Sequence, residues 1–132
     1  MTKHITKSNE DYLEAILMIR EERGTCRSID VAYHLNVSKP SVSVAMANLE
    51  KMGLVVMEPT HELKLTRTGT RYARRVLERH RLISAALMKL GVPQEIAEAD
   101  ACRIEHDISQ ESYDGLKAWY DRCEKAASEP QA

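Results

Sequence analysis

The feature that most constrains the fold is a series of helix start and stop signals that leaves room for a single pair of strands. Apolar residues recur at helical spacing in several segments of the chain. Four of these segments open with a serine, and three close with a glycine. The serines are Ser8, Ser28, Ser38 and Ser109, and the glycines are Gly24, Gly53 and Gly91. Only residues 54–57 and 63–66, on either side of a turn, are typical of strands.

These signals predict six helices and one β-hairpin. The first helix should begin with a capping box of Ser8 and Asp11. The helices are expected at residues 8–22, 28–35, 38–52, 69–89, 94–107 and 110–126. The order helix, short helix, turn, helix, hairpin is typical of a winged helix-turn-helix domain. We therefore expect a mainly α protein with a small β-wing: a winged helix-turn-helix domain at 1–70, followed by an all-helical domain at 71–132.

Charge is distributed unevenly along the 132 residues. The whole chain carries a formal charge of −1, but residues 39–81 hold five more basic than acidic residues. The composition is globular, and no apolar run is long enough to span a membrane. The N-terminus lacks the apolar stretch of a signal peptide, and three cysteines are too few for a disulfide framework. We predict a cytoplasmic protein that binds nucleic acid, makes no membrane contact and, because the chain is small, forms a homodimer.

The predicted third helix carries small, polar and basic residues at its start, where a reading helix enters the major groove. The candidates for contacts with double-stranded operator DNA are Arg27, Ser38, Lys39, Pro40, Ser41, Ser43, Lys64 and Arg67. No Arg, Asn or Gln stands in the first turns of this helix, so we expect most of the affinity to come from phosphates. Contacts of Pro40 and Ser41 with thymine methyls, or DNA shape, are expected to add specificity.

Several side chains able to bind a metal stand at helical spacing. Cys102, Glu105 and His106 occupy positions i, i+3 and i+4, which would place them on one helix face. Asp11 and Glu14 stand three residues apart on the first predicted helix, and His80 lies on the long one. Taken singly, each of these residues has a structural explanation. Asp11 would serve as a capping acid, for example, and Cys102 as a small thiol of the core.

Five ordered blocks of sequence resemble one family. They are residues 9–16, 37–43, 63–69, 79–82 and 101–109. Together they resemble the metal-dependent repressors of the diphtheria toxin repressor and manganese transport regulator family, over about residues 7–125.

The resemblance implies a homodimer whose second domain, residues 71–132, binds metal and dimerises. It places Asp11, Glu14, His80, Cys102, Glu105 and His106 at ligand positions. An ion held by the first helix and by the second domain would be the expected basis of metal-dependent DNA binding. The expected output is repression of metal-uptake genes. By this resemblance we expect the two-domain form, without the SH3-like domain of the iron-responsive branch.

The implied ligands mix the two branches of that family. Asp11 is the type of the manganese branch, whereas Cys102 is the type of the iron branch. Oxygen ligands favour Mn²⁺, and a thiolate raises affinity for Fe²⁺, Co²⁺, Ni²⁺ and Zn²⁺. We expect Mn²⁺ or Fe²⁺ as the sensed metal, with a slight preference for Mn²⁺, and expect Co²⁺, Ni²⁺ or Zn²⁺ to bind in vitro.

Three other functions compete with this interpretation. Cys102 and His106 are spaced to act as an enzymatic nucleophile and base, but no oxyanion-hole motif accompanies them, so we predict no enzyme. The main alternative is a winged-helix regulator that senses thiol oxidation or a small molecule through the Cys102 region. It predicts DNA release on oxidation and indifference to chelators. A structural zinc module is disfavoured because the chain has no CxxC pair.

Overall fold

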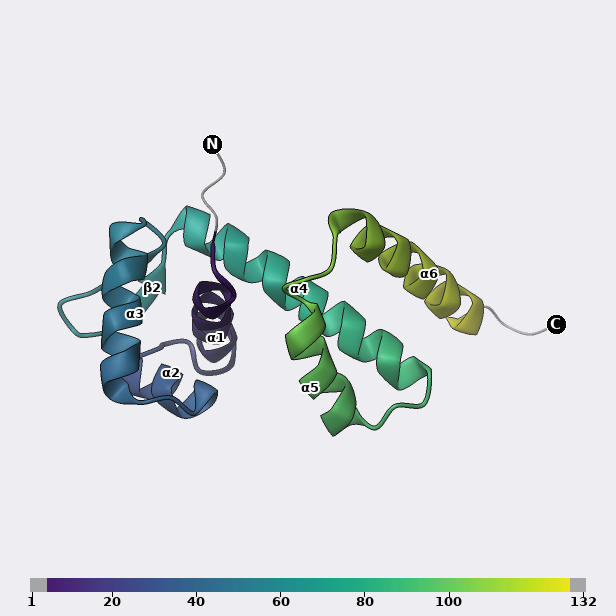
Figure 1. The fold of residues 1–132 in the computed structure, drawn as a ribbon, viewed down its shortest axis with the longest axis horizontal. Helices are drawn as coiled ribbons and strands as arrows, with labels where there is room; N and C mark the ends of the chain where they lie inside the picture. The colour runs from purple at the N-terminus through teal and green to yellow at the C-terminus, as the bar shows by residue number, and fades with distance from the viewer. Residues whose placement is uncertain (1–4, 129–132) are drawn as a thin grey trace. The chain divides into compact units, whose positions relative to one another are not determined.

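The computed structural model describes residues 5–128 and contains the expected kinds of elements (Figure 1). In chain order they are α1 (Lys7–Arg23), α2 (Ser28–Leu35), α3 (Lys39–Lys51), β1 (Val55–Met57), β2 (Leu63–Leu65), α4 (Arg67–Lys89), α5 (Gln94–Ile104) and α6 (Gln110–Ser128). The mainly α fold with a small β-wing is confirmed. The chain divides into two compact units between Val76 and Leu77, inside α4. The expected domain boundary after residue 70 stays a prediction.

The first unit is a three-helix cluster with a hairpin. Leu13 and Ile16 of α1, Val31 of α2, and Val42 and Leu49 of α3 are all fully buried. Each such side chain contributes about 1.5–3 kcal/mol to folding when it leaves water. Because these residues come from three helices, they fix α3 in place while its opposite face stays exposed.

The helix caps agree with the sequence prediction in part. The Ser38 hydroxyl accepts a hydrogen bond from the backbone N–H of Ser41, as expected for the cap of α3. Asn36 adopts the left-handed conformation that ends α2. The capping box of Ser8 and Asp11 was wrong, because the Thr6 hydroxyl caps α1 instead, two residues earlier. The cap of α2 likewise lies at Arg27 and not at Ser28.

The hairpin is tied to the end of α1. Strands β1 and β2 pair antiparallel, with Val55 opposite Leu65 and Met57 opposite Leu63. The Arg20 guanidinium donates to the Glu62 carboxylate at 2.9 Å and to the Leu63 carbonyl at 3.0 Å. The Leu63 N–H in turn donates to the Cys26 carbonyl. These bonds hold the returning strand against the helical cluster.

The start of α4 is packed directly against the backbone that leads into the hairpin. The Thr66 hydroxyl accepts from the Gly69 N–H and donates to the Gly53 carbonyl. Gly69 lies so close to the Leu54 carbonyl that a Cβ at this position would overlap it. A glycine is therefore required here for close approach, whereas its backbone angles are those of an ordinary helix.

The second unit contains the rest of α4 with α5 and α6. Ala97 and Ala101 of α5 are fully buried, and on α4 Ile83 and Ala86 are also buried. Small residues one turn apart let α5 pack closely. Helix α6 has no buried residue, and a Lys89–Glu124 ion pair of 2.6 Å links it to α4. The unit therefore has a thin core for its length.

Two glycine-to-alanine substitutions should change stability in opposite directions. Gly69→Ala forces a Cβ against the Leu54 carbonyl and should cost at least about 2 kcal/mol. Gly115→Ala, in the interior of α6, meets nothing within 4 Å and should stabilise by about 0.5–1 kcal/mol through helix propensity. Thermal melting of both variants beside the wild type measures this. Equal melting temperatures for the two variants would contradict the close packing at Gly69.

Candidate functional site

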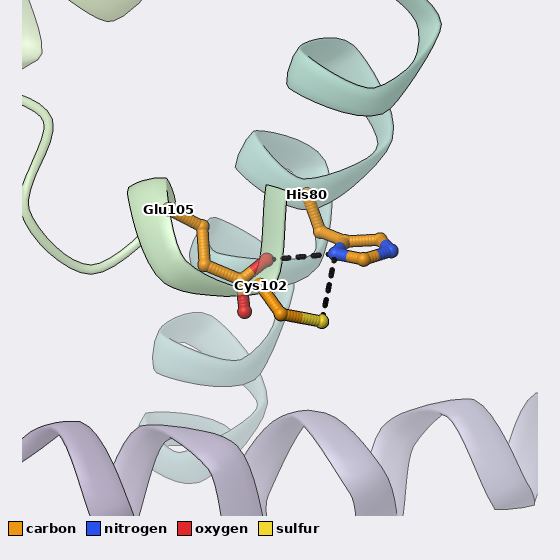
Figure 2. A group of neighbouring side chains, drawn as sticks. All are labelled: His80, Cys102 and Glu105. Carbon is orange, nitrogen blue, oxygen red and sulfur yellow. Dashed lines mark hydrogen bonds and ion pairs between the residues drawn. The ribbon is translucent and has the colours of Figure 1, made fainter. Parts of the chain in front are cut away.

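Three side chains able to bind a metal converge in the second unit (Figure 2). His80 projects from α4, and Cys102 projects from the last turn of α5. Glu105 is the C-cap residue of α5. His80 Nδ1 lies 2.8 Å from Glu105 Oε2 and 3.7 Å from Cys102 Sγ. One potential ligand atom of each residue lies within 4.8 Å of the others. Nitrogen, sulfur and oxygen donors at this spacing fit a single divalent ion.

Glu105 is the buried centre of this group. Its side chain is 0% exposed, and its second carboxylate oxygen lies 3.3 Å from His106 Nε2. The carboxylate therefore has an imidazole nitrogen beside each oxygen. A buried carboxylate is costly unless it is paired or hydrogen-bonded; His80 lies at hydrogen-bond distance from Oε2, whereas Oε1 is buried with no hydrogen-bond partner among the described residues. Cys102, in contrast, is exposed and lies at the open edge of the group.

The ends of the helices differ from the sequence prediction at this point. Residues 94–107 were expected to form one helix, but α5 ends at Ile104. His106 stands in a turn, where the N–H groups of Asp107 and Ile108 both donate to the Ile104 carbonyl. The expected single helix face for Cys102, Glu105 and His106 was therefore wrong in detail. A turn brings Glu105 and His106 to the site, and only Cys102 is presented by the helix itself.

Asp11 and Glu14 lie on α1 in the first unit, three residues apart as the sequence predicted. Asp11 is half-buried, and Glu14 is 8% exposed. A glutamate this deeply buried is unusual on a helix that otherwise buries Leu13 and Ile16. Their role as metal ligands stays a prediction.

The three cysteines have different environments. All are free thiols, and Cys26 is fully buried beneath the hairpin. Burial raises the pKa of the Cys26 thiol to about 12, and the nearby Asp30 carboxylate acts in the same direction. Cys26 is consequently protonated and unreactive at neutral pH. Cys102 is the exposed thiol next to an imidazole, and Cys123 is half-buried on α6.

The residues predicted to contact DNA all lie in or next to the first five elements. Around the start of α3 every candidate is exposed: Ser38, Lys39, Pro40, Ser41 and Ser43. Arg27 at the cap of α2 and Arg67, the first residue of α4, are exposed as well. Lys64 on β2 is exposed, and its ammonium lies 3.7 Å from the Glu58 carboxylate. The Ser38 hydroxyl is already used as a helix cap, and it also bonds the Ser41 hydroxyl at 2.8 Å.

Val44 is a residue of this surface that the sequence reasoning missed. It lies on the outward side of α3 and is 63% exposed, whereas Val42 and Ala45 beside it are buried. The signal was available, because Val44 falls one turn after Pro40, on the side opposite the apolar core positions.

No helix among residues 5–128 is long and apolar enough to cross a membrane.

Comparison with known proteins places both halves of the chain. Residues 4–63 match the model for the N-terminal DNA-binding domain of iron-dependent repressors, and residues 66–129 match the model for their metal-binding and dimerisation domain. The chain is 38% identical over 108 residues to the transcriptional regulator MntR of Escherichia coli O157:H7, covering 82% of this chain and 70% of that protein. It is 37% identical over 111 residues to MntR of Bacillus subtilis strain 168, and the match covers 84% of this chain and 78% of that protein.

Solved structures show the same arrangement of elements. The structure of T. acidophilum IdeR matches with a TM-score of 0.78 at 26% identity, covering 91% of this chain and 56% of that one. The manganese regulator SloR matches with a TM-score of 0.77 at 27% identity, and the match covers 89% of this chain and 55% of the SloR chain. The chain thus spans just over half the length of these two structures.

These relatives are transcriptional regulators and not enzymes, which agrees with the prediction made from the sequence. The order of elements, the two matched domain models and the identity to MntR proteins lead to one conclusion: the chain belongs to the family of iron-dependent repressors and MntR-type transcriptional regulators.

Proposed function

We propose that this protein is a metal-activated repressor that binds double-stranded operator DNA as a homodimer and controls metal-uptake genes in response to Mn²⁺ or Fe²⁺. The observation that carries this proposal is the convergence of His80, Cys102 and Glu105 in a chain whose other unit is a winged helix-turn-helix. The solved relative SloR, which is named as a manganese regulator, supports it.

The residues of the second unit suit a divalent metal. A bound ion would supply positive charge beside the buried Glu105 carboxylate, where two imidazoles stand now. His80 and His106 offer ring nitrogens, Glu105 offers carboxylate oxygen, and Cys102 offers a thiolate from the exposed edge. We retain Asp11 and Glu14 as predicted ligands on the strength of the family resemblance.

The choice of metal rests on the donor set. The proposed oxygen donors of Asp11, Glu14 and Glu105 favour Mn²⁺, and the name of the manganese regulator SloR agrees. The sulfur of Cys102 favours softer ions, which keeps Fe²⁺ as the second candidate and makes Co²⁺, Ni²⁺ and Zn²⁺ suitable in vitro. Cys102 is therefore the residue that should tune selectivity.

The DNA contacts are proposed to combine charge with an apolar surface. Lys39, Arg27, Lys64 and Arg67 would contact phosphates, and the start of α3 would enter the major groove. Val44 cannot donate or accept a hydrogen bond, so it would discriminate bases through the thymine methyl group.

Exposed apolar residues of the second unit support the homodimer. Large apolar side chains remain open on α4, α5 and the segment between them, namely Met88, Leu90, Ile96 and Ile104. Helix α6 buries no residue within one chain. A second copy would give this unit the core that it lacks alone.

The first test of this function is metal-dependent binding to a random-sequence DNA duplex library. Protein stripped with a chelator should bind weakly, and adding back Mn²⁺ or Fe²⁺ should raise affinity by at least about tenfold, a coupling of about 1.4 kcal/mol. In Cys102→Glu the thiolate is replaced by a harder donor of the same charge, so activation should shift towards Mn²⁺ relative to Fe²⁺ and Co²⁺. Activation curves for each metal, measured by fluorescence anisotropy, give the ranking.

His106→Ala serves as the companion variant, because it removes a donor without replacing it. It should lose metal activation while the circular dichroism spectrum is retained. If the metal ranking of Cys102→Glu equals that of the wild type and its melting temperature falls sharply, Cys102 is a packing residue and not a ligand. If chelators leave the DNA affinity unchanged but peroxide releases the protein from DNA, the alternative of thiol sensing at Cys102 is favoured.

A second test concerns Val44. On a duplex selected from the library, replacing the contacted thymine by uracil removes only a methyl group and should weaken wild-type binding about threefold to tenfold, as the loss of one apolar contact does. Val44→Ala should weaken binding similarly and make the protein indifferent to that replacement. Ser43→Ala, on the same helix, is the control and should stay sensitive to uracil. If the losses of binding free energy caused by Val44→Ala and by uracil add at every thymine position, Val44 does not contact a thymine methyl group.

A further inference from the structure

Arg79 is a buried arginine that no metal or DNA role accounts for. It directly precedes His80 on α4 and is only 5% exposed. Its guanidinium donates to the Ile108 carbonyl at 2.7 Å, to the Glu105 carbonyl at 3.5 Å and to the Gln110 side-chain oxygen at 3.2 Å. The same group lies over the Tyr113 ring, 5.6 Å from its centre. These contacts fall on the segment that joins α5 to α6 and on the first turn of α6.

This segment needs such a partner because of how α5 ends. The last four carbonyls of a helix have no partner within the helix, and they carry the negative end of its dipole. Helix α5 stops at Ile104, and the Glu105 and Ile108 carbonyls that follow point to Arg79. A cation from α4 therefore caps the turn that follows α5, whereas the Ile104 carbonyl itself accepts from the N–H groups of Asp107 and Ile108.

The cap acts where the metal-binding residues stand. Arg79 holds the backbone on both sides of His106, while the next residue, His80, contacts the Glu105 side chain at 2.8 Å. Two consecutive residues of α4 thus hold one turn. Arg79 binds backbone carbonyls of the turn, and His80 binds the Glu105 side chain. The Glu105 carboxylate consequently faces His80.

We propose that Arg79 is a positioning residue that sets the turn of Glu105 and His106 in place before metal binds. The inference rests on the proposed metal-sensing function. It differs from a general stabilising role because the effect is confined to the turn at residues 105–110. A lysine cannot replace the arginine, since its single ammonium cannot reach two carbonyls and an amide and also stack on the Tyr113 ring.

The test uses the full chain with Arg79→Lys, which keeps the charge and most of the aliphatic stem. In the metal-free protein, amide hydrogen exchange at Asp107 and Ile108 should become at least tenfold faster, while the amides of α1 and α3 stay unchanged. The Mn²⁺ dissociation constant, measured by calorimetry, should rise about tenfold or more, as for other partners of metal ligands. Arg75→Lys, an exposed arginine on the same helix, is the control and should leave both quantities within twofold of the wild type.

Gln110→Ala gives a second variant that leaves Arg79 itself intact. Gln110 is exposed, so its loss should not unfold the unit, but it removes one acceptor of the guanidinium. Exchange at Ile108 should then be about threefold faster. Unchanged exchange in both Arg79→Lys and Gln110→Ala would overturn the proposal, as would unchanged Mn²⁺ affinity in a folded Arg79→Lys protein. A wild-type chain that binds no divalent ion would contradict the proposed function, and the exchange measurement would still decide the role of Arg79.

Discussion

The interaction around which the second unit is built is the contact of the buried Glu105 carboxylate with His80, beside a second imidazole from His106. His80 Nδ1 lies 2.8 Å from one oxygen and His106 Nε2 lies 3.3 Å from the other. A carboxylate without solvent is costly unless charge or hydrogen bonds compensate it. The unit therefore keeps a polar centre where a hydrophobic core would give more stability. Such an arrangement is typical of a binding site and not of a structural core.

The rest of the unit is arranged around that centre. Ala97 and Ala101 let α5 approach closely, which places Cys102 beside His80. Arg79 holds the turn that carries Glu105 and His106. The apolar side chains that remain are few and partly exposed, such as Leu90 and Ile96. A small core and a costly polar site together make a second copy of the chain a natural source of stability.

The first unit follows simpler rules. Its helices bury one apolar face each, and Ser38 and Asn36 mark the boundaries that helix-turn-helix geometry requires. The outward side of α3 has no packing role, which leaves Lys39 and Val44 available for a partner. Arg20 ties the wing to α1 through Glu62, so the hairpin extends a rigid surface.

The sequence by itself determined the element order, because caps, glycines and apolar spacing act locally. It also singled out Cys102, Glu105 and His106, since residue type and spacing are visible without a structure. Only tertiary structure decided how these residues meet. Helix α5 ends three residues earlier than its pattern predicts, because a helix terminus depends on what accepts or donates at its last carbonyls. The turn that follows the helix is held by Arg79, 26 residues before Glu105 in the chain. No local rule connects the two, and packing alone brings them together.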